Sequence, residues 1–269
     1  RYGQIYKQYF KRKGKCEMKL GVTLFNFHRE IKTLSDLDNV LSFLKSLGTN
    51  TVQISGISHI PYADAAVLCQ KHGMEVCLTH NSKERILNET DTLIEEHKLL
   101  GCKNIGLGAM GEEYRSLDGY KKFIAEFTPA AQKIKDAGLQ FAYHNHAFEF
   151  ERYGGRKGMD ILIEDTDPNL FNFIVDTHWV QTGGCNPADY IRKVKGRMSV
   201  CHFKDYRIIN GERDFAEIGT GNLNLDECYR ACQETGVEYI IIEQDSTAID
   251  IFESTKISVN NLFEIAARS

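Results

Sequence analysis

Residues 173–178 read Phe-Ile-Val-Asp-Thr-His, an apolar run that ends in an acid and an imidazole. Three other stretches repeat this pattern: Gln-Phe-Ala-Tyr-His-Asn-His (140–146), Met-Ser-Val-Cys-His-Phe-Lys-Asp (198–205) and Tyr-Ile-Ile-Ile-Glu-Gln (239–244). A near-continuous apolar run is typical of a buried parallel strand. Polar groups at the C-terminal ends of such strands stand where α/β folds keep their active sites. The four stretches therefore predict an α/β fold with a site built from His, Asp, His and Glu.

Strand-like and helix-like segments alternate along the whole chain. The segment 34–47, for example, carries its leucines at helical spacing on one face. The predicted strands are 19–25, 51–55, 75–80, 104–109, 139–146, 172–178, 198–204 and 238–244. Several predicted helices end in a glycine that suits a left-handed C-cap: Gly48, Gly73, Gly101, Gly138, Gly196 and Gly236. Eight repeats predict a single-domain (β/α)₈ TIM barrel; a doubly wound open sheet is the alternative, but no Gly-x-Gly-x-x-Gly follows the first strand.

Composition and charge narrow the possible partners and the compartment. The net charge of −4 gives no global reason to expect nucleic acid or an anionic membrane as a partner. The eight cysteines form no Cys-x-x-Cys pair, and there is neither a signal-peptide pattern nor an apolar run of transmembrane length, so we expect a soluble cytoplasmic protein. Residues 1–17 are basic and are predicted to be an extension before the barrel at 18–269, with a functional basic arm as the alternative.

Three strand-end residues are the strongest candidates for a metal site: Asp176, His202 and Glu243. A carboxylate at the end of an apolar run is costly to bury unless it is paired or bound to a metal. Carboxylate and imidazole ligands from three strands suit one divalent ion of the Mn, Zn, Co or Mg type. The alternative is an internal salt-bridge cluster with Lys204 or Arg207.

Strand alternation predicts which other side chains enter the barrel mouth, because successive residues face the interior and the helix layer in turn. Asn145 should then face the helices. The pairs expected to share the inward face are His144 with His146, Asp176 with His178, and His202 with Lys204. Two histidines at i and i+2 beside acids favour a function in acid/base chemistry or ligation.

Further polar groups fall at or just after strand ends. Lys204 is either an electrophilic group that contacts a substrate oxygen or half of an ion pair. Gln53 and His80 close the second and third strands, and Glu149 lies in the loop after the fifth strand. Loop residues at this position often touch substrate, so these three are predicted to bind it.

At these residues the chain resembles the xylose isomerase-like TIM barrel superfamily, and within it the sugar phosphate isomerase/epimerase group that includes inosose dehydratase. The matching motifs follow the family order over residues 18–269. They are Tyr-His-Asn-His (143–146), Val-Asp-Thr-His-Trp-Val-Gln-Thr-Gly-Gly (175–184), His-Phe-Lys-Asp (202–205), Ile-Gly-Thr-Gly-Asn-Leu (218–223) and Ile-Ile-Glu (241–243).

The resemblance implies four metal ligands, of which the last three fall on Asp176, His202 and Glu243. The first falls on His144, where epimerases of the group carry a glutamate. In those epimerases two glutamates exchange protons on opposite faces of the sugar carbon, so this departure puts two-base epimerisation in doubt. Trp179 is a second departure, since it stands where many relatives carry histidine; Trp179 and His178 are predicted to contact substrate.

The His-x-His motif is similar to that of inosose dehydratase-like and keto-glycoside lyase-like branches, which remove a proton next to a carbonyl and expel a β-leaving group. We assign His144 to the metal and His146 to the base, with the reverse assignment open, and count Glu243 as both ligand and catalytic group. The expected function is sugar (phosphate) isomerisation or epimerisation, with β-elimination from a keto-sugar, 3-keto-glycoside or inosose as the alternative. An apurinic-site endonuclease is disfavoured, a non-catalytic sugar-binding barrel remains as another class, and a homo-oligomer is possible.

Overall fold

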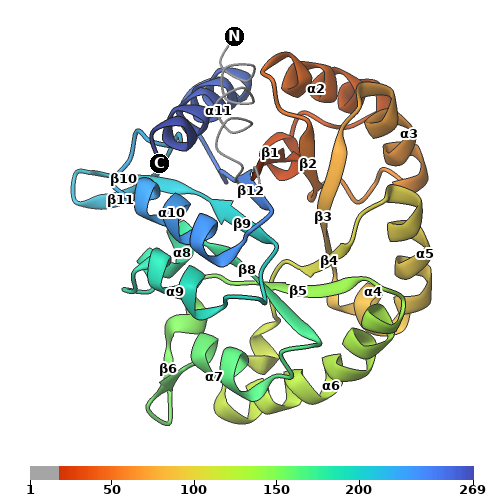
Figure 1. Cartoon of the computed structure of the whole chain (residues 1–269), viewed down its shortest axis with the longest axis vertical. Coiled ribbons are helices and arrows are strands. Elements are labelled where there is room, and N and C mark those ends of the chain that lie inside the picture. Colours follow the sequence, from red (N-terminus) through yellow and green to blue (C-terminus); the bar gives the residue numbers. More distant parts are fainter. Residues whose placement is uncertain (1–17) are drawn as a thin grey trace.

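The computed structural model describes residues 18–269, so the predicted extension at 1–17 lies outside it. Eight parallel strands close a barrel in the order β1-β12-β9-β8-β5-β4-β3-β2 (Figure 1). The strands are β1 (Lys19–Thr23), β2 (Thr51–Ile54), β3 (Glu75–Asn81), β4 (Asn104–Leu107), β5 (Gln140–His144), β8 (Phe171–Asp176), β9 (Val200–Phe203) and β12 (Tyr239–Ile242). The predicted (β/α)₈ barrel is confirmed, and each predicted strand corresponds to one of these eight.

Helices form the outer layer around the strands (Figure 1). They are α2 (Leu34–Ser46), α3 (Tyr62–His72), α4 (Lys83–Asn88), α5 (Thr90–Leu100), α6 (Leu117–Asp136), α7 (Gly158–Asp165), α8 (Thr177–Thr182), α9 (Pro187–Lys193), α10 (Leu225–Thr235) and α11 (Ile251–Arg268). Two hairpins interrupt the repeat: β6 (Arg152–Tyr153) with β7 (Arg156–Lys157), and β10 (Asp205–Ile209) with β11 (Glu212–Ala216). None of the helices over 18–269 has the length and apolar character needed to cross a membrane.

Three of the six predicted glycine stops are C-cap residues of helices: Gly73, Gly101 and Gly236. Gly73 and Gly101 cap α3 and α5 with φ of +60° and +65°, and their N–H groups bond carbonyls in the last turn. A side chain is strained in this left-handed conformation, so glycine lets each helix turn back into a strand. The four predicted stops besides Gly73 and Gly101 also have positive φ. The cysteines that the structure describes form no disulfide.

A small apolar cluster fills the barrel interior. It includes Ala142, Ile174, Val200 and Ile241, one from each of β5, β8, β9 and β12. Side chains alternate along a strand, so the residues two positions further on should also face the interior. Those residues are His144, Asp176, His202 and Glu243. The apolar cluster is therefore the layer on which a polar layer rests at the C-terminal end of the barrel.

Candidate metal centre and active site

Four buried side chains converge at the C-terminal ends of four adjacent strands. They are His144, Asp176, His202 and Glu243, and one ligand atom from each lies within 4.8 Å of every other. The strand register sets this arrangement, since Asp176 pairs directly with His202 across β8 and β9. The sequence-predicted set of four is thus brought together as one cluster, which we call the four-ligand cluster.

Hydrogen bonds outside the cluster orient both imidazoles. His144 Nδ1 donates to the Gly108 carbonyl at 3.0 Å, and His202 Nε2 donates to Gln53 Oε1 at 2.6 Å. Because a ring nitrogen that donates outward fixes the tautomer, the opposite nitrogen presents a lone pair to the cluster. Both histidines thereby turn their second ring nitrogen, His144 Nε2 and His202 Nδ1, toward the cluster, where its lone pair could bind a metal.

The atoms that face one another inside the cluster lack hydrogen-bond partners. His144 Nε2, Asp176 Oδ2 and His202 Nδ1 are buried and unpartnered. His144 Nε2 lies 3.5 Å from Asp176 Oδ2, and His202 Nδ1 lies 2.9 Å from Glu243 Oε2. Buried polar atoms are nearly always satisfied, so three of them directed at one point indicate a missing partner. Two imidazole nitrogens and two carboxylates are a donor set that fits a divalent metal.

The two carboxylates are ionised despite their burial. Burial acts to raise the pKa of Asp176, but Lys204 and His144 lower it. Burial opposes ionisation of Glu243 too, yet His202 and Lys204 hold the pKa of that carboxyl well below its usual range. Burial also acts to lower the pKa of His144, but Asp176 and Glu243 raise it. A proton on His144 and a metal ion compete for the same lone pair, so metal affinity should weaken in acid.

Lys204 forms the ion pair that was one of the two arrangements left open by the sequence. Its side chain is 1% exposed, and Nζ lies 3.4 Å from Glu243 Oε1 and 2.5 Å from Asp245 Oδ1. The ammonium also lies 4.8 Å from the centre of the Trp179 ring. The ion pair is therefore present, and it places the ammonium at the edge of the four-ligand cluster. Arg207 is not part of it, because Arg207 pairs with Asp214 on the β10–β11 hairpin.

His146 stands beside the cluster but not on a strand. β5 ends at His144, and the ring centroids of His144 and His146 are 4.9 Å apart. His146 Nδ1 is buried without a partner, and burial together with the neighbouring His144 imidazole lowers the pKa of His146 to about 3. The imidazole is therefore neutral at pH 7, the form that can accept a proton.

Glu149 holds the turn that carries His146. It is fully buried, its Oε2 accepts from the His146 backbone N–H at 2.8 Å, and its Oε1 accepts from the Tyr143 hydroxyl at 2.6 Å. Burial raises the pKa of Glu149 to about 7. Direct substrate contact, as predicted from the sequence, is less consistent with this geometry than a positioning role. Asn145 is buried too, and its side chain accepts from the backbone N–H of Asp176.

His178 and Trp179 belong to α8, since β8 ends at Asp176 and strand alternation does not extend past it. The His178 ring lies 4.9 Å from Phe215, and burial lowers the pKa of His178 to about 4. The Trp179 ring lies 5.4 Å from His146. These rings form one aromatic wall of the mouth. Phe215 of β11 was missed from the sequence because a hairpin folds it back onto the site.

Gln53 and His80 support the cluster from the opposite side. Gln53 is fully buried; its Oε1 accepts from His202, and its Nε2 lies 3.4 Å from His80 Nε2. His80 lies against the rings of His144 and His202, at 5.3 and 5.6 Å between centroids. Gln53, predicted to bind substrate, therefore has both ends of its amide occupied by histidines.

Several groups of the site carry no signal that the sequence reasoning used. The Gly108 carbonyl is a backbone acceptor, which no residue type reveals. Asp245 lies three positions past the end of β12, where strand alternation no longer applies. Asp205 of the His-Phe-Lys-Asp motif is structural: it accepts backbone N–H groups of the loop that contains Gly219 and Gly221.

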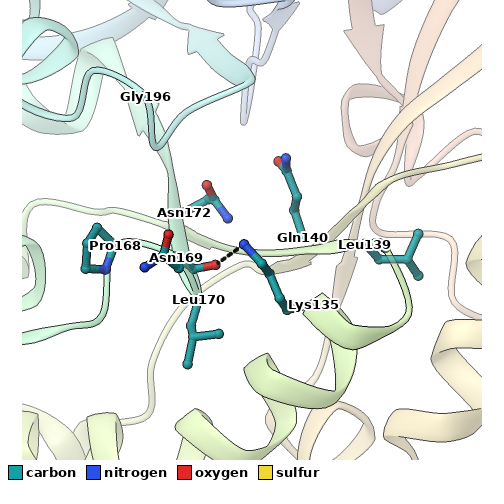
Figure 2. Close-up of a pocket in the computed structure, with 9 residues that line it drawn as sticks. Lys135, Leu139, Gln140, Pro168, Asn169, Leu170, Asn172 and Gly196 are labelled. Carbon is teal, nitrogen blue, oxygen red and sulfur yellow. Dashed lines mark hydrogen bonds between the residues drawn. The ribbon is translucent and has the colours of Figure 1, made fainter.

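A separate cavity of about 320 Å³ lies at the other end of the barrel (Figure 2). It is lined by residues that precede or begin β5 and β8, among them Gln140 and Leu170. Lys135 crosses it and donates to the Asn169 carbonyl at 3.0 Å (Figure 2). Catalytic groups of such barrels lie at the C-terminal ends of the strands, so this cavity is not the candidate active site.

Comparisons with known proteins agree with this architecture. The family model for xylose isomerase-like TIM barrels matches residues 19–259. The chain is 32% identical over 78 residues to an inosose dehydratase from Geobacillus kaustophilus, a match that spans 29% of this chain and only 25% of that protein.

Solved structures match over nearly the whole chain, at identities that establish the fold alone. A sugar phosphate isomerase/epimerase from Parabacteroides distasonis is 21% identical, with a TM-score of 0.76 over 93% of this chain and 95% of its own. A probable 3-DHS dehydratase from Bacillus anthracis is 12% identical, with a TM-score of 0.72 over 91% and 98%. The IOLI protein with a bound zinc atom is 16% identical, with a TM-score of 0.70 over 93% and 99%.

Proposed function

The chain belongs to the xylose isomerase-like TIM barrel family, and on that premise we propose that it is a metal-dependent enzyme acting on a sugar or keto-sugar by proton abstraction next to a carbonyl. Isomerisation or epimerisation is the reaction we favour. The observation that carries the proposal is the set of three buried, unpartnered lone-pair atoms on His144, Asp176 and His202. With the Glu243 carboxylate they would hold one divalent ion.

The ion would supply Lewis-acid polarisation of a substrate oxygen. His146 is the group we assign to the proton: its neutral imidazole lies next to the cluster, and Glu149 fixes the turn on which it stands. Lys204 would donate a hydrogen bond to a substrate oxygen while its charge balances Glu243 and Asp245. His178 and Trp179 would contact the substrate from the aromatic wall, and their apolar ring faces would exclude water from the reacting atoms.

β-Elimination is the second candidate, and one observation favours it. The β5 ligand position carries an imidazole, so the cluster holds carboxylates on β8 and β12 but none on β5. One base suffices for elimination from a keto-sugar, 3-keto-glycoside or inosose, whereas epimerisation through a planar intermediate needs proton transfer on two faces. Similar proteins include dehydratases as well as isomerases, so both reactions belong in the test.

Metal analysis coupled to proton exchange in deuterated water tests the proposal. The purified chain should contain about one divalent ion, and Glu243→Gln should lose both the ion and exchange at the substrate α-carbon. Ketoses, inososes and 3-keto-glycosides form the panel, and loss of a leaving group separates elimination from isomerisation. If the chain binds a panel sugar, but binds no metal and catalyses no deuterium exchange into that sugar, it would instead be a non-catalytic sugar-binding barrel.

A further inference from the structure

Two cavities open beside the four-ligand cluster, over the C-terminal end of β3. Their volumes are about 600 and 560 Å³, and both are lined by His80, Asn81 and Ser82. The His80 ring contacts the rings of His144 and His202. The His80 ring therefore separates both cavities from the four-ligand cluster. A substrate whose reacting carbon lies at the cluster would place its remote part in these cavities.

The first cavity contains one cation, and its charge is already neutralised. Arg85 Nη2 lies 2.7 Å from Glu96 Oε2, and both residues line the cavity. The Arg85 Nε atom lies 3.2 Å from Glu89 Oε2 as well. The Tyr62 hydroxyl donates to the Asn81 side chain, so this wall is polar but uncharged. The Arg85 guanidinium is therefore already paired with carboxylates of the protein and carries no uncompensated charge that would attract an anion.

The second cavity repeats this arrangement. Lys83 is its one lysine or arginine, and Nζ lies 2.5 Å from Glu113 Oε1. Glu84 lines the same cavity, with Oε1 4.0 Å from Lys83 Nζ. Together the two cavities present two cations and three carboxylates, so an incoming anion meets more negative than positive charge.

We infer that these cavities hold the remote part of the substrate and that this part is an uncharged, hydroxyl-rich group rather than a phosphate. The inference rests on the proposed function, and it narrows the substrate to unphosphorylated sugars or glycosides. A phosphate carries close to two negative charges, so it would have to displace Glu96 or Glu113 or lie beside them unpaired. Hydroxyl groups can donate to a carboxylate and accept from a guanidinium, so they fit the paired charges without displacing either.

Glu96→Gln tests the inference because it removes the carboxylate and leaves Arg85 in place. The matched control is Glu227→Gln, which also takes a half-buried carboxylate from an arginine, but on α10 and away from both cavities. Each protein is assayed for deuterium exchange with D-fructose, D-tagatose and their 6-phosphates. In parallel, inorganic phosphate is titrated into the metal-free proteins and its binding followed by phosphorus NMR line broadening.

The wild type should exchange each phosphate at least about tenfold more slowly than its parent sugar, since one unpaired like charge at contact distance has this effect even in a watery site. It should also give no saturable phosphate binding. Glu96→Gln should reduce the ratio of the exchange rate of each parent sugar to that of its phosphate, and it should gain phosphate binding. Glu227→Gln should behave as the wild type.

Faster exchange of a phosphorylated sugar by the wild type would overturn the inference and leave the proposed function standing. Saturable phosphate binding by the wild type that Arg85→Met abolishes would overturn it too. If no sugar exchanges deuterium, the proposed function fails for this panel. The phosphate titration then still tests the inference that the cavities reject a phosphate. Phosphate binding gained by Glu96→Gln, but not by Glu227→Gln, supports that inference, and no gain in Glu96→Gln contradicts it.

Discussion

Gln53 orients one of the four cluster side chains without belonging to the cluster itself. Its amide joins His80 on β3 to His202 on β9, so the His202 tautomer depends on a glutamine 149 positions away in the chain. Groups that orient a metal-bound imidazole commonly affect metal affinity by 10- to 100-fold. The Gly108 carbonyl orients His144 in the same way, but it is a backbone group, so substitution of a side chain does not remove it.

Gln53→Met should therefore weaken divalent-metal binding by about 10- to 100-fold, because methionine fills the same space without accepting from His202. Competition with a chelating dye measures the affinity. Gln53→Glu retains an oxygen acceptor and should recover most of the loss. Equal affinity in wild type and Gln53→Met would return Gln53 to its sequence-predicted role in substrate binding.

The two histidines of the β5 motif should separate by phenotype. His146→Ala should keep fold and metal but lose α-carbon deuterium exchange by about 10²–10⁴-fold, the usual contribution of a positioned base. His144→Ala should lose the metal itself, because it removes one of the four ligand atoms. If His146→Ala loses the metal and His144→Ala keeps it, then His146 is the ligand and His144 the base. If both variants exchange deuterium at the wild-type rate, neither histidine takes part in the chemistry.

Glu149 should impose a pH dependence on stability. Its pKa is raised from 4.5 to about 7 by burial, so the folded chain keeps a proton that the unfolded chain releases. The free energy of unfolding therefore falls as pH rises from about 4.5 to 7, by about 3 kcal/mol for a full shift of this size. Glu149→Gln should lack this component. Chemical denaturation of both metal-free proteins at pH 5 and pH 8 measures it, and parallel pH profiles would contradict the assignment.

At the scale of elements, one side chain couples the metal centre to a helix. Asp176 ends β8 and also caps α8: its Oδ1 accepts from the Trp179 N–H at 3.0 Å, while Oδ2 faces the cluster. Trp179 and His178 are therefore held over the site by the same carboxylate that would bind the ion. Metal ligation would therefore depend on the same residue that sets the position of the aromatic wall.

Substitutions at Asp176 can separate these two roles. Asp176→Asn keeps an oxygen for the cap but loses the carboxylate, whereas Asp176→Ala loses both. Both variants should lose the metal. In the metal-free state, Asp176→Ala should be less stable than Asp176→Asn by about 1 kcal/mol, the usual contribution of a helix N-cap. Denaturant unfolding measures the difference; equal stabilities would mean that α8 does not depend on its cap.

The sequence predicted the elements well and their ends less well. Apolar runs and glycine stops were sufficient for all eight strands, because parallel strands buried on both faces leave that pattern. The predicted strand 139–146 in fact ends at His144. The Glu149 carboxylate accepts a hydrogen bond from the His146 backbone N–H, and the chain turns there instead of continuing the strand. This contact joins residues on a loop, and no periodicity in the sequence reports it.

At the scale of the molecule, the convergence of the four cluster side chains was predictable because each ends an apolar strand, and closure of the barrel brings such ends together. Their supporting groups were not predictable in that role. The Gln53 amide on β2 reaches His202 on β9 across the barrel, a contact that exists only once the ring has closed, and the Gly108 carbonyl that contacts His144 is a backbone group.

Removal of the metal should destabilise the whole barrel, because the ion would bind four strands of the folded chain and none of the unfolded one. Free metal at 100 times its dissociation constant adds about 2.7 kcal/mol to the free energy of unfolding. Chelation should therefore lower the melting temperature by several degrees in the wild type. Glu243→Gln should show no such shift, and an equal shift in both proteins would place the ion elsewhere.

The position of β12 between β9 and β1 has a consequence for synthesis. The ribosome makes this strand last among the eight, and it must insert between two strands made earlier. Until Glu243 has emerged, a nascent chain has two open sheet edges and an incomplete set of ligands. Exposed edges of this kind invite pairing with other chains. Acquisition of the metal would then mark the moment at which the barrel has closed and its two sheet edges are no longer exposed.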